Sequence, residues 1–182
     1  MKGRINKGRI AFTKSNKIWK SKQVNRKTKL KLYKTTVRPV LLNGCETWKM
    51  NRSDEKKLDS FQYQCLKKIM QIFWPNIIST DELNEVTQVK KISLEVKRRR
   101  WNWLGHVLRK VKGHYWMAAL TWQPECRRRV GRPKTTWRRT LEKERKEFRW
   151  RTWHEAWLQP RDRMIWRKSV EVLCASRHEE DK

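Results

Sequence analysis

The chain has 182 residues, and its 47 Lys and Arg against 18 Asp and Glu give a formal net charge of +29. Charge of this size and sign predicts a polyanionic partner, RNA or DNA, because phosphate contacts relieve the repulsion among cations and release counterions. The composition excludes two classes of protein, membrane-spanning proteins and wholly disordered chains. No stretch approaches the ~18 apolar residues of a membrane-spanning helix, and twelve tryptophans do not fit a wholly disordered chain.

With 37% hydrophobic and 36% charged residues, the chain is expected to form one domain of roughly 100–150 residues or two small subdomains, with basic extensions. No apolar signal-peptide segment follows Met1, so we expect an intracellular protein. Cys45, Cys65, Cys126 and Cys174 lack the close spacing of zinc ligands and are interpreted as reduced thiols. We expect no metal, no cofactor and no membrane partner, and the oligomeric state stays open.

The first 45 residues contain 14 Lys or Arg and no carboxylate. Residues 1–24 are therefore predicted to form a basic N-terminal arm. A helix should follow, with Asn25 as its N-cap and a kink or early end at Pro39. Its apolar positions have helical spacing: Leu30, Tyr33, Val37 and Leu41. A small extended piece is expected near residues 46–48.

The segment SDEKKLDSFQYQCLKKIMQIFWP is the clearest amphipathic helix in the sequence. Ser53 is predicted to cap it, Asp54 and Glu55 suit the positive end of its dipole, and Trp74–Pro75 should end it. Its apolar residues fall 3 or 4 positions apart: Leu58, Phe61, Cys65, Ile69 and Ile72.

Further helices are expected along the rest of the chain. A capping box at Ser79 predicts a short helix to about Val89, and an apolar stripe predicts a longer helix over 92–111. Residues 114–122 read as a short helix and 124–134 as a loop, and Pro133 suits the start of another helix. The last helix is predicted over 161–174. The fold class is therefore all-α, with no convincing strands.

Catalysis by two metal ions needs converging carboxylates, and the five aspartates of this chain include no adjacent pair. No phosphate-binding loop or nucleophile-elbow motif occurs either. We expect a structural imidazole at His106 and a buried ion pair at Glu46, with a functional role as the alternative for each. No catalytic residue and no enzyme activity are predicted for this chain.

Residues 127–151 contain twelve Lys or Arg and three Glu, interrupted by Trp137 and Trp150. Arginine forks match phosphate oxygens, and arginine and tryptophan planes stack on unpaired bases. Core packing is the alternative for most of the tryptophans, given their helical spacing. This segment is therefore predicted to contact a phosphate backbone.

Gly131-Arg132-Pro133 resembles the core of an AT-hook, which inserts into the minor groove of A·T-rich DNA. That motif normally has arginine before the glycine, and Val130 stands there. We prefer a loop and helix N-terminus that hold phosphate. A nuclear-localisation signal is a further reading of the same run, and a nuclear protein is expected.

An ordered set of phrases, strongest in LLNGCETW and WLGHVLRK, resembles the C-terminal part of the endonuclease/reverse-transcriptase polyprotein of non-LTR (LINE-type, RTE-like) retrotransposons. The resemblance covers about residues 3–176. It implies that the chain corresponds to the region after the reverse-transcriptase palm, with both catalytic modules upstream. That palm would then be a partner within the parent polyprotein.

The resemblance also implies a division of the chain and a role for its parts. Residues 25–90 would form a thumb-like helical region, 91–176 a small, basic, Trp-rich helical C-terminal region, and 177–182 a disordered tail. Residues 27–48 resemble the thumb-side helix that rests against the template–primer duplex. The matches to a W-x-G-H-x-x-R phrase of the family are Arg99, Arg100, Trp101, Trp103, Gly105, His106 and Arg109. Asn43 stands where the family often has tyrosine.

The predicted function is non-catalytic binding of template RNA, target DNA or their hybrid through phosphate contacts. The alternatives are a stand-alone basic DNA- or RNA-binding protein, and a domesticated or pseudogene remnant. The predicted contact residues are Arg127, Arg128, Arg129, Arg132, Lys134, Arg138, Arg139, Arg99, Arg100, Arg109, Lys27, Lys29 and Lys31.

Overall fold

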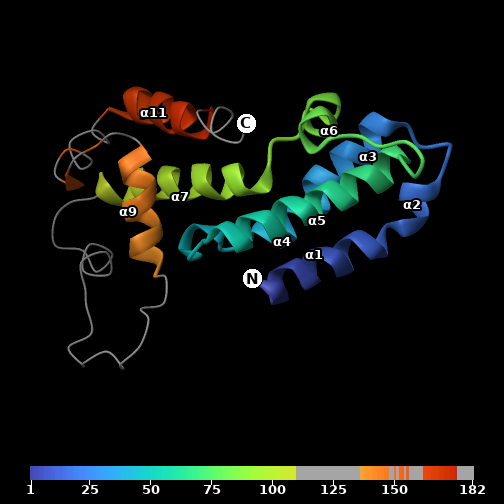
Figure 1. Ribbon diagram of the computed structural model, residues 1–182, viewed down its shortest axis with the longest axis horizontal. Coiled ribbons are helices and arrows are strands. Elements are labelled where there is room, and N and C mark those ends of the chain that lie inside the picture. Colours follow the sequence, from blue (N-terminus) through green and yellow to red (C-terminus); the bar gives the residue numbers. More distant parts are fainter. Residues whose placement is uncertain (110–135, 148–149, 151, 154, 156–161, 176–182) are drawn as a thin grey trace. The chain divides into compact units, whose positions relative to one another are not determined.

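The structure, a computed structural model, describes residues 1–109, 136–147, 150, 152–153, 155 and 162–175. These residues form helices joined by turns, and no strand occurs among them, which confirms the all-α prediction (Figure 1). The helix predicted over 114–122, the loop over 124–134 and the tail over 177–182 lie outside the described residues.

The chain divides into two compact units. Unit 1 comprises Met1–Cys45 and Arg52–Val96, and unit 2 comprises Glu46–Asn51 and Lys97–Lys182. This grouping differs from the boundaries at 24/25 and 90/91 expected from the sequence, which remain predictions as functional divisions. The difference arises because helix packing, rather than local charge, decides which residues share a core.

Unit 1 is built from short helices and one long one. Its elements are α1 (Lys2–Lys14), α2 (Asn16–Lys20), α3 (Arg26–Leu32), the π-helical segment Tyr33–Val37, α4 (Arg38–Leu42), α5 (Arg52–Met70), α6 (Thr80–Thr87) and the first turn of α7 (Ile92–Leu108).

Residues 1–24, predicted as an arm, contribute two aromatic side chains to the core of unit 1. Phe12 on α1 and Trp19 on α2 are buried, and their rings stack 5.0 Å apart. The Trp19 indole N–H donates to the carbonyl oxygen of Phe12 over 2.7 Å. The cations of this segment cover its outside, which is why its charge alone suggested an extension.

Two predicted helix starts are confirmed, because the side chains of Asn25 and Ser79 accept from the backbone N–H groups three residues on, over 2.7 and 3.1 Å. Ser53 is not a cap: α5 begins at Arg52, so Ser53 lies in its first turn. The predicted extended piece is wrong at Glu46 and Thr47, because Cys45–Thr47 forms a 3-10 turn.

Pro39 lies in the first turn of α4, directly after the π-helical segment Tyr33–Val37. Proline cannot donate a backbone hydrogen bond, and its ring displaces the carbonyl four residues earlier. Widening of the preceding turn accommodates both effects. The predicted kink is therefore realised as a π-helical insertion between α3 and α4.

The amphipathic prediction for α5 is confirmed, although the helix ends at Met70, before the end predicted at Trp74–Pro75. Its apolar stripe forms the centre of unit 1, with Leu58, Leu66 and Ile69 almost wholly buried. Cys65 is buried on the same side, and this burial raises the pKa of its thiol to about 12, so the group is uncharged at neutral pH.

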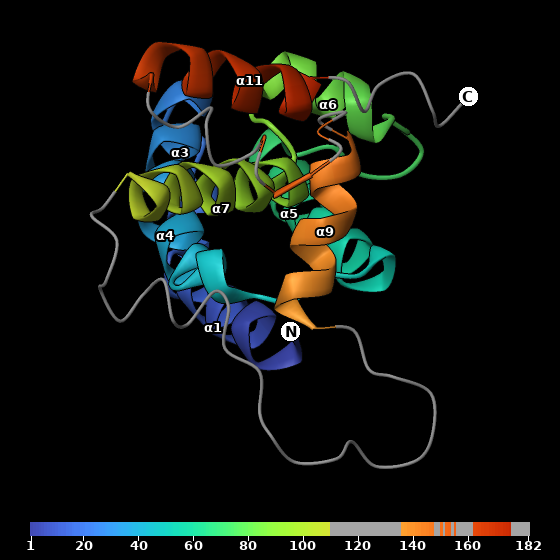
Figure 2. The ribbon, with the colours of Figure 1, turned by 90° about the vertical axis from the view of Figure 1, so that its left-hand side faces the viewer.

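Unit 2 combines the rest of α7 with α9 (Trp137–Glu147) and α11 (Arg163–Ala175), which Figure 2 shows around α7. Its core consists of Trp101, Leu104, Leu141, Trp166, Val170 and Leu173. Trp103, Trp137, Trp150 and Trp153 pack against this core while remaining partly accessible. Among the described residues of unit 2, these six tryptophans therefore lie in the core or pack against it, as their spacing indicated.

In the part of the chain that the structure describes, none of the helices combines the length and the apolar character needed to cross a membrane.

Trp19→Ala is expected to lower the free energy of unfolding by about 3–5 kcal/mol, because it removes a fully buried ring and its hydrogen bond. Ile18→Ala, at the exposed neighbouring position, is the matched control and should change stability little. Urea denaturation followed by circular dichroism measures both. A Trp19→Ala protein as stable as the control would show that residues 1–24 do not belong to the core.

Candidate nucleic-acid interface

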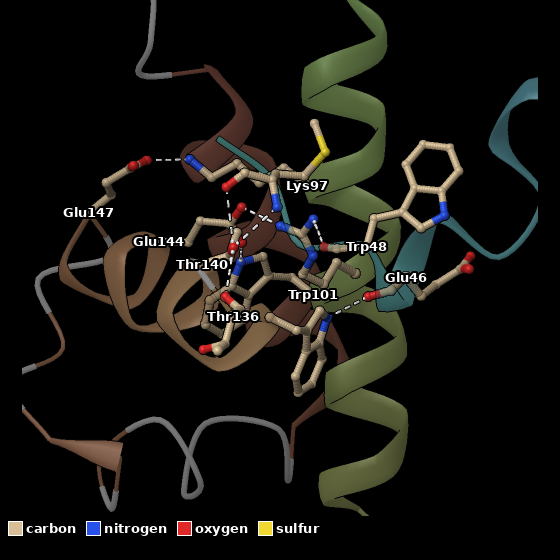
Figure 3. A network of polar contacts seen from close by, with 11 residues as sticks. Glu46, Trp48, Lys97, Trp101, Thr136, Thr140, Glu144 and Glu147 are labelled. Atoms are coloured by element: carbon tan, nitrogen blue, oxygen red, sulfur yellow. Dashed lines mark hydrogen bonds and ion pairs between the residues drawn. The ribbon is translucent and has the colours of Figure 1, made fainter. Parts of the chain in front are cut away.

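A buried ion pair joins α7 to α9 in unit 2. Arg100 is wholly buried and donates through Nη1 to the Glu144 carboxylate, whose second oxygen accepts from the Trp101 indole over 2.8 Å (Figure 3). Burial raises the pKa of Glu144, and the Arg100 guanidinium opposes that shift. The prediction of Arg100 as a nucleic-acid contact is therefore corrected: its guanidinium is inside the protein.

The same network fixes the segment Glu46–Asn51. Arg100 donates through Nη2 to the Trp48 carbonyl over 2.9 Å, and the Trp137 indole donates to the Glu46 carbonyl over 2.8 Å. The Thr140 hydroxyl bonds both backbone groups of Met50 at 3.2 Å. Polar groups that would be costly to bury unpaired thus hold α7, α9 and this segment together. Glu46 enters through its backbone oxygen, and its predicted ion pair stays a prediction.

The prediction of Lys29 in unit 1 as a nucleic-acid contact is also corrected. Its side chain is buried, and its ammonium donates to the carbonyl oxygens of Trp19 and Ser21 over 2.9 and 2.7 Å. The cation satisfies carbonyls at the C-terminal end of α2, where the helix dipole favours positive charge. Lys29 therefore holds α3 to α2 and is not available to a phosphate.

Gly105 allows α11 to approach α7 closely. A Cβ at Gly105 would overlap the Trp166 indole, with Cδ1 of that ring only 2.8 Å away. The Trp166 indole N–H donates to the Trp101 carbonyl over 3.1 Å across this contact. The glycine of the WLGHVLRK phrase thus has a packing role, which sets the spacing between the faces of α7 and α11.

Between these two helix faces lies a hollow of about 560 Å³, here called the arginine hollow. Four positions at helical spacing along α7 and just beyond it line one wall. Two arginines one turn apart on α11 line the other, together with Trp166, Val170 and Glu171 of the same helix. The lining residues are Arg98, Asn102, His106, Arg109, Arg163, Trp166, Arg167, Val170 and Glu171.

The hollow brings like charges together. Partial burial lowers the pKa of Arg109, and the positive charges of Arg163 and Arg167 lower it further. Glu171 is the one carboxylate among the lining residues. Cations gathered in this way repel each other, and a bound anion would remove that repulsion.

Guanidinium groups form paired hydrogen bonds with phosphate oxygens. A hollow of about 560 Å³ also falls within the usual volume range of ligand sites. The arrangement is suited to a phosphate group or a short phosphodiester stretch. Among the described residues, no three His, Cys, Asp or Glu side chains are grouped so that they could hold a metal ion.

The other predicted contact residues are dispersed. Arg138 and Arg139 are exposed on α9, Arg99 is half-buried on α7, and Lys27 and Lys31 are exposed on α3. Of the predicted contact residues that the structure describes, only Arg109 lies in the arginine hollow. A larger group, predicted in the 127–134 run, lies outside the described residues: Arg127, Arg128, Arg129, Arg132 and Lys134.

Sequence reasoning missed Arg98, Arg163 and Arg167 as site residues and expected His106 to be structural. His106 is exposed and lines the hollow. A signal was present, because Arg98, His106 and Arg109 share one face at helical spacing. The pairing of that face with α11 required the tertiary structure.

The chain is similar to a transposon-derived protein of Caenorhabditis elegans, with 26% identity over 125 residues. The matched region covers 66% of this chain and 45% of that protein's length. No family model matches the chain, and no solved structure matches it. The similarity points to a transposon-related origin.

Gly105→Ala should destabilise unit 2 by about 1–3 kcal/mol or more, because the added methyl group forces Trp166 away from α7. Gly3→Ala is the matched control, since its Cβ would meet no atom within 4 Å. Thermal unfolding monitored by tryptophan fluorescence compares the two. Equal midpoints would mean that the close contact at Gly105 is not needed for packing.

Glu144→Gln should cost about 3–5 kcal/mol of folding free energy, because it leaves the Arg100 charge buried without its counter-ion. Glu85→Gln makes the same chemical change at an exposed site and should have little effect. Urea unfolding curves measure the difference. A Glu144→Gln protein as stable as the Glu85→Gln protein would contradict the assignment of this ion pair as a structural element.

Proposed function

We propose that this chain is a non-catalytic, nucleic-acid-binding region of a non-LTR retrotransposon reverse transcriptase. It contacts template RNA, target DNA or their hybrid through the phosphate backbone, while the polymerase and endonuclease residues lie elsewhere in the parent protein. The observation that carries the proposal is the arginine hollow, where Arg109, Arg163 and Arg167 converge.

Arg109, Arg163 and Arg167 line the same hollow, and phosphate is the anion that guanidinium groups match best. The net charge of +29 supports a polyanion rather than a single small ion, since long-range attraction then steers the whole molecule to its partner. The similarity to a transposon-derived protein supports a role in element mobility over other uses of a basic protein.

Binding through guanidinium–phosphate pairs holds a strand in place without reading its sequence. The exposed cations Arg138, Arg139, Lys27 and Lys31 would add contacts of the same kind. A nuclear location, where the target DNA is found, is part of this proposal.

Replacement of both Arg163 and Arg167 by Ala should weaken binding to RNA, duplex DNA and hybrid by about tenfold or more at physiological salt. It should also reduce the slope of log K against log salt by about 1.5, because each lost phosphate contact removes about 0.7–0.9. The double substitution Lys49→Ala with Lys168→Ala is the control, since it removes the same charge from exposed positions outside the hollow.

If both double variants bind alike, the attraction is that of net charge alone and the arginine hollow has no special role. A third variant, with Arg132, Arg138 and Arg139 changed to Ala, tests the predicted 127–139 surface in the same titrations. Fluorescence anisotropy with labelled oligonucleotides over a salt series measures all of them.

A further inference from the structure

Unit 1 carries a second surface of one sign, the solvent-exposed face of α5. Five residues of α5 spaced 3 or 4 apart form this face and are all exposed: Ser53, Lys57, Ser60, Gln64 and Lys68. They are cations or neutral hydrogen-bond donors, with no carboxylate among them. This face is called the α5 track.

The carboxylates of α5 point to other faces of the helix, where their positions serve structure. Asp59 accepts from the Ser93 backbone N–H over 2.9 Å and from its hydroxyl over 2.6 Å, at the start of α7. Asp54 and Glu55 lie in the first turn, where negative charge suits the helix dipole. The α5 track is therefore left uniformly positive or neutral along its whole length.

Over its first half the α5 track borders a groove shared with α1, which runs alongside α5 in Figure 1. The groove has a volume of about 910 Å³. Lys2 and Arg9 line it from α1, while Arg52, Lys56 and Lys57 line it from α5. No carboxylate is among its lining residues, so the groove is suited to an extended, negatively charged chain.

At the other end of α5, the following loop exposes two aromatic rings. Phe73 is 60% exposed and Trp74 is 87% exposed. The loop is held in place at three points: Ile72 N–H donates to the Lys67 carbonyl over 3.0 Å, Asn76 N–H to the Phe73 carbonyl over 2.9 Å, and the Tyr63 hydroxyl to the Ile78 carbonyl over 2.7 Å. The rings are thus presented on a fixed support.

The surroundings of these rings indicate what covers them. Exposed aromatic groups in a contiguous patch mark a binding surface. Lys68 precedes the loop on α5, and the Gln71 amide donates to the Lys20 carbonyl over 3.5 Å, which brings α2 and its lysines beside it. Flat apolar faces among cations fit an unpaired base with its phosphate better than an apolar protein or lipid surface.

We propose that the α5 track binds a single strand of nucleic acid, with its backbone in the α1–α5 groove and its bases stacked on Trp74 and Phe73. The 19 residues of α5 span about 28 Å, the length of about eight bases at the stacked rise of 3.4 Å. This rests on the proposed function and narrows it: unit 1 selects unpaired strands over duplexes, as a protein handling primer or template ends would require.

Trp74→Leu tests the stacking step, because it keeps an apolar side chain and removes the ring. In the full chain it should lower the affinity for a labelled ten-nucleotide single strand about 5–100-fold. Affinity for duplex DNA and the salt slope should stay unchanged, because no phosphate contact is lost. Trp74→Phe should restore most of the binding. Ile77→Ala, at an equally exposed position of the same loop, should have no effect.

The backbone step is tested by Lys57→Ala with Lys68→Ala. This pair should reduce the single-strand salt slope by about 1.4, at about 0.7 per phosphate contact. Lys7→Ala with Lys90→Ala removes the same charge from exposed positions of unit 1 that lie off the α5 track. This control pair should change the single-strand salt slope less than the Lys57→Ala, Lys68→Ala pair does.

The inference is overturned if Trp74→Leu weakens single-strand and duplex binding equally, or weakens neither. It is also overturned if Trp74→Leu abolishes binding to vesicles of anionic lipid and leaves oligonucleotide binding intact, since the loop would then serve a membrane surface. Each of these results can occur while the arginine-hollow variants still reduce binding, so this failure and that of the proposed function are told apart. A chain that binds no oligonucleotide at all overturns both.

Discussion

The structure depends on how repulsion among its 47 cationic side chains is relieved. Only 18 carboxylates oppose this repulsion, so their positions matter. Several carboxylates are used inside or at helix ends. Glu144 neutralises buried Arg100, Glu147 pairs with Lys97, and Asp59 holds the start of α7. Carboxylates placed in this way stabilise the fold, and Glu171 is the one carboxylate among the residues that line the arginine hollow and the α1–α5 groove.

That arrangement explains why the two candidate surfaces are of different kinds. In unit 2, arginines from α7 and α11 meet over Trp166, and Gly105 allows the helices to come close enough to form a hollow. In unit 1, cations line an open groove that is followed by exposed Trp74. The first surface is suited to gripping phosphate, and the second adds flat apolar faces on which unpaired bases can stack.

Much of the fold could be predicted from the sequence, because local signals determine helices. The all-α class, the caps at Asn25 and Ser79, and the apolar stripe of α5 all followed from residue type and spacing. The site was predicted far less well. Charge marks candidate contacts but does not separate a buried lysine such as Lys29 from an exposed one.

The sequence by itself determined that the chain is helical and strongly basic, because helical periodicity depends on the local order of residues and net charge depends on composition alone. Tertiary structure alone decided which cations are inside, as with Arg100, and which meet across helices, as with Arg109 and Arg163. It also decided that Trp101 is buried while Trp74 is exposed. The physical reason is that burial and the meeting of charges depend on residues far apart in sequence, which only packing brings together.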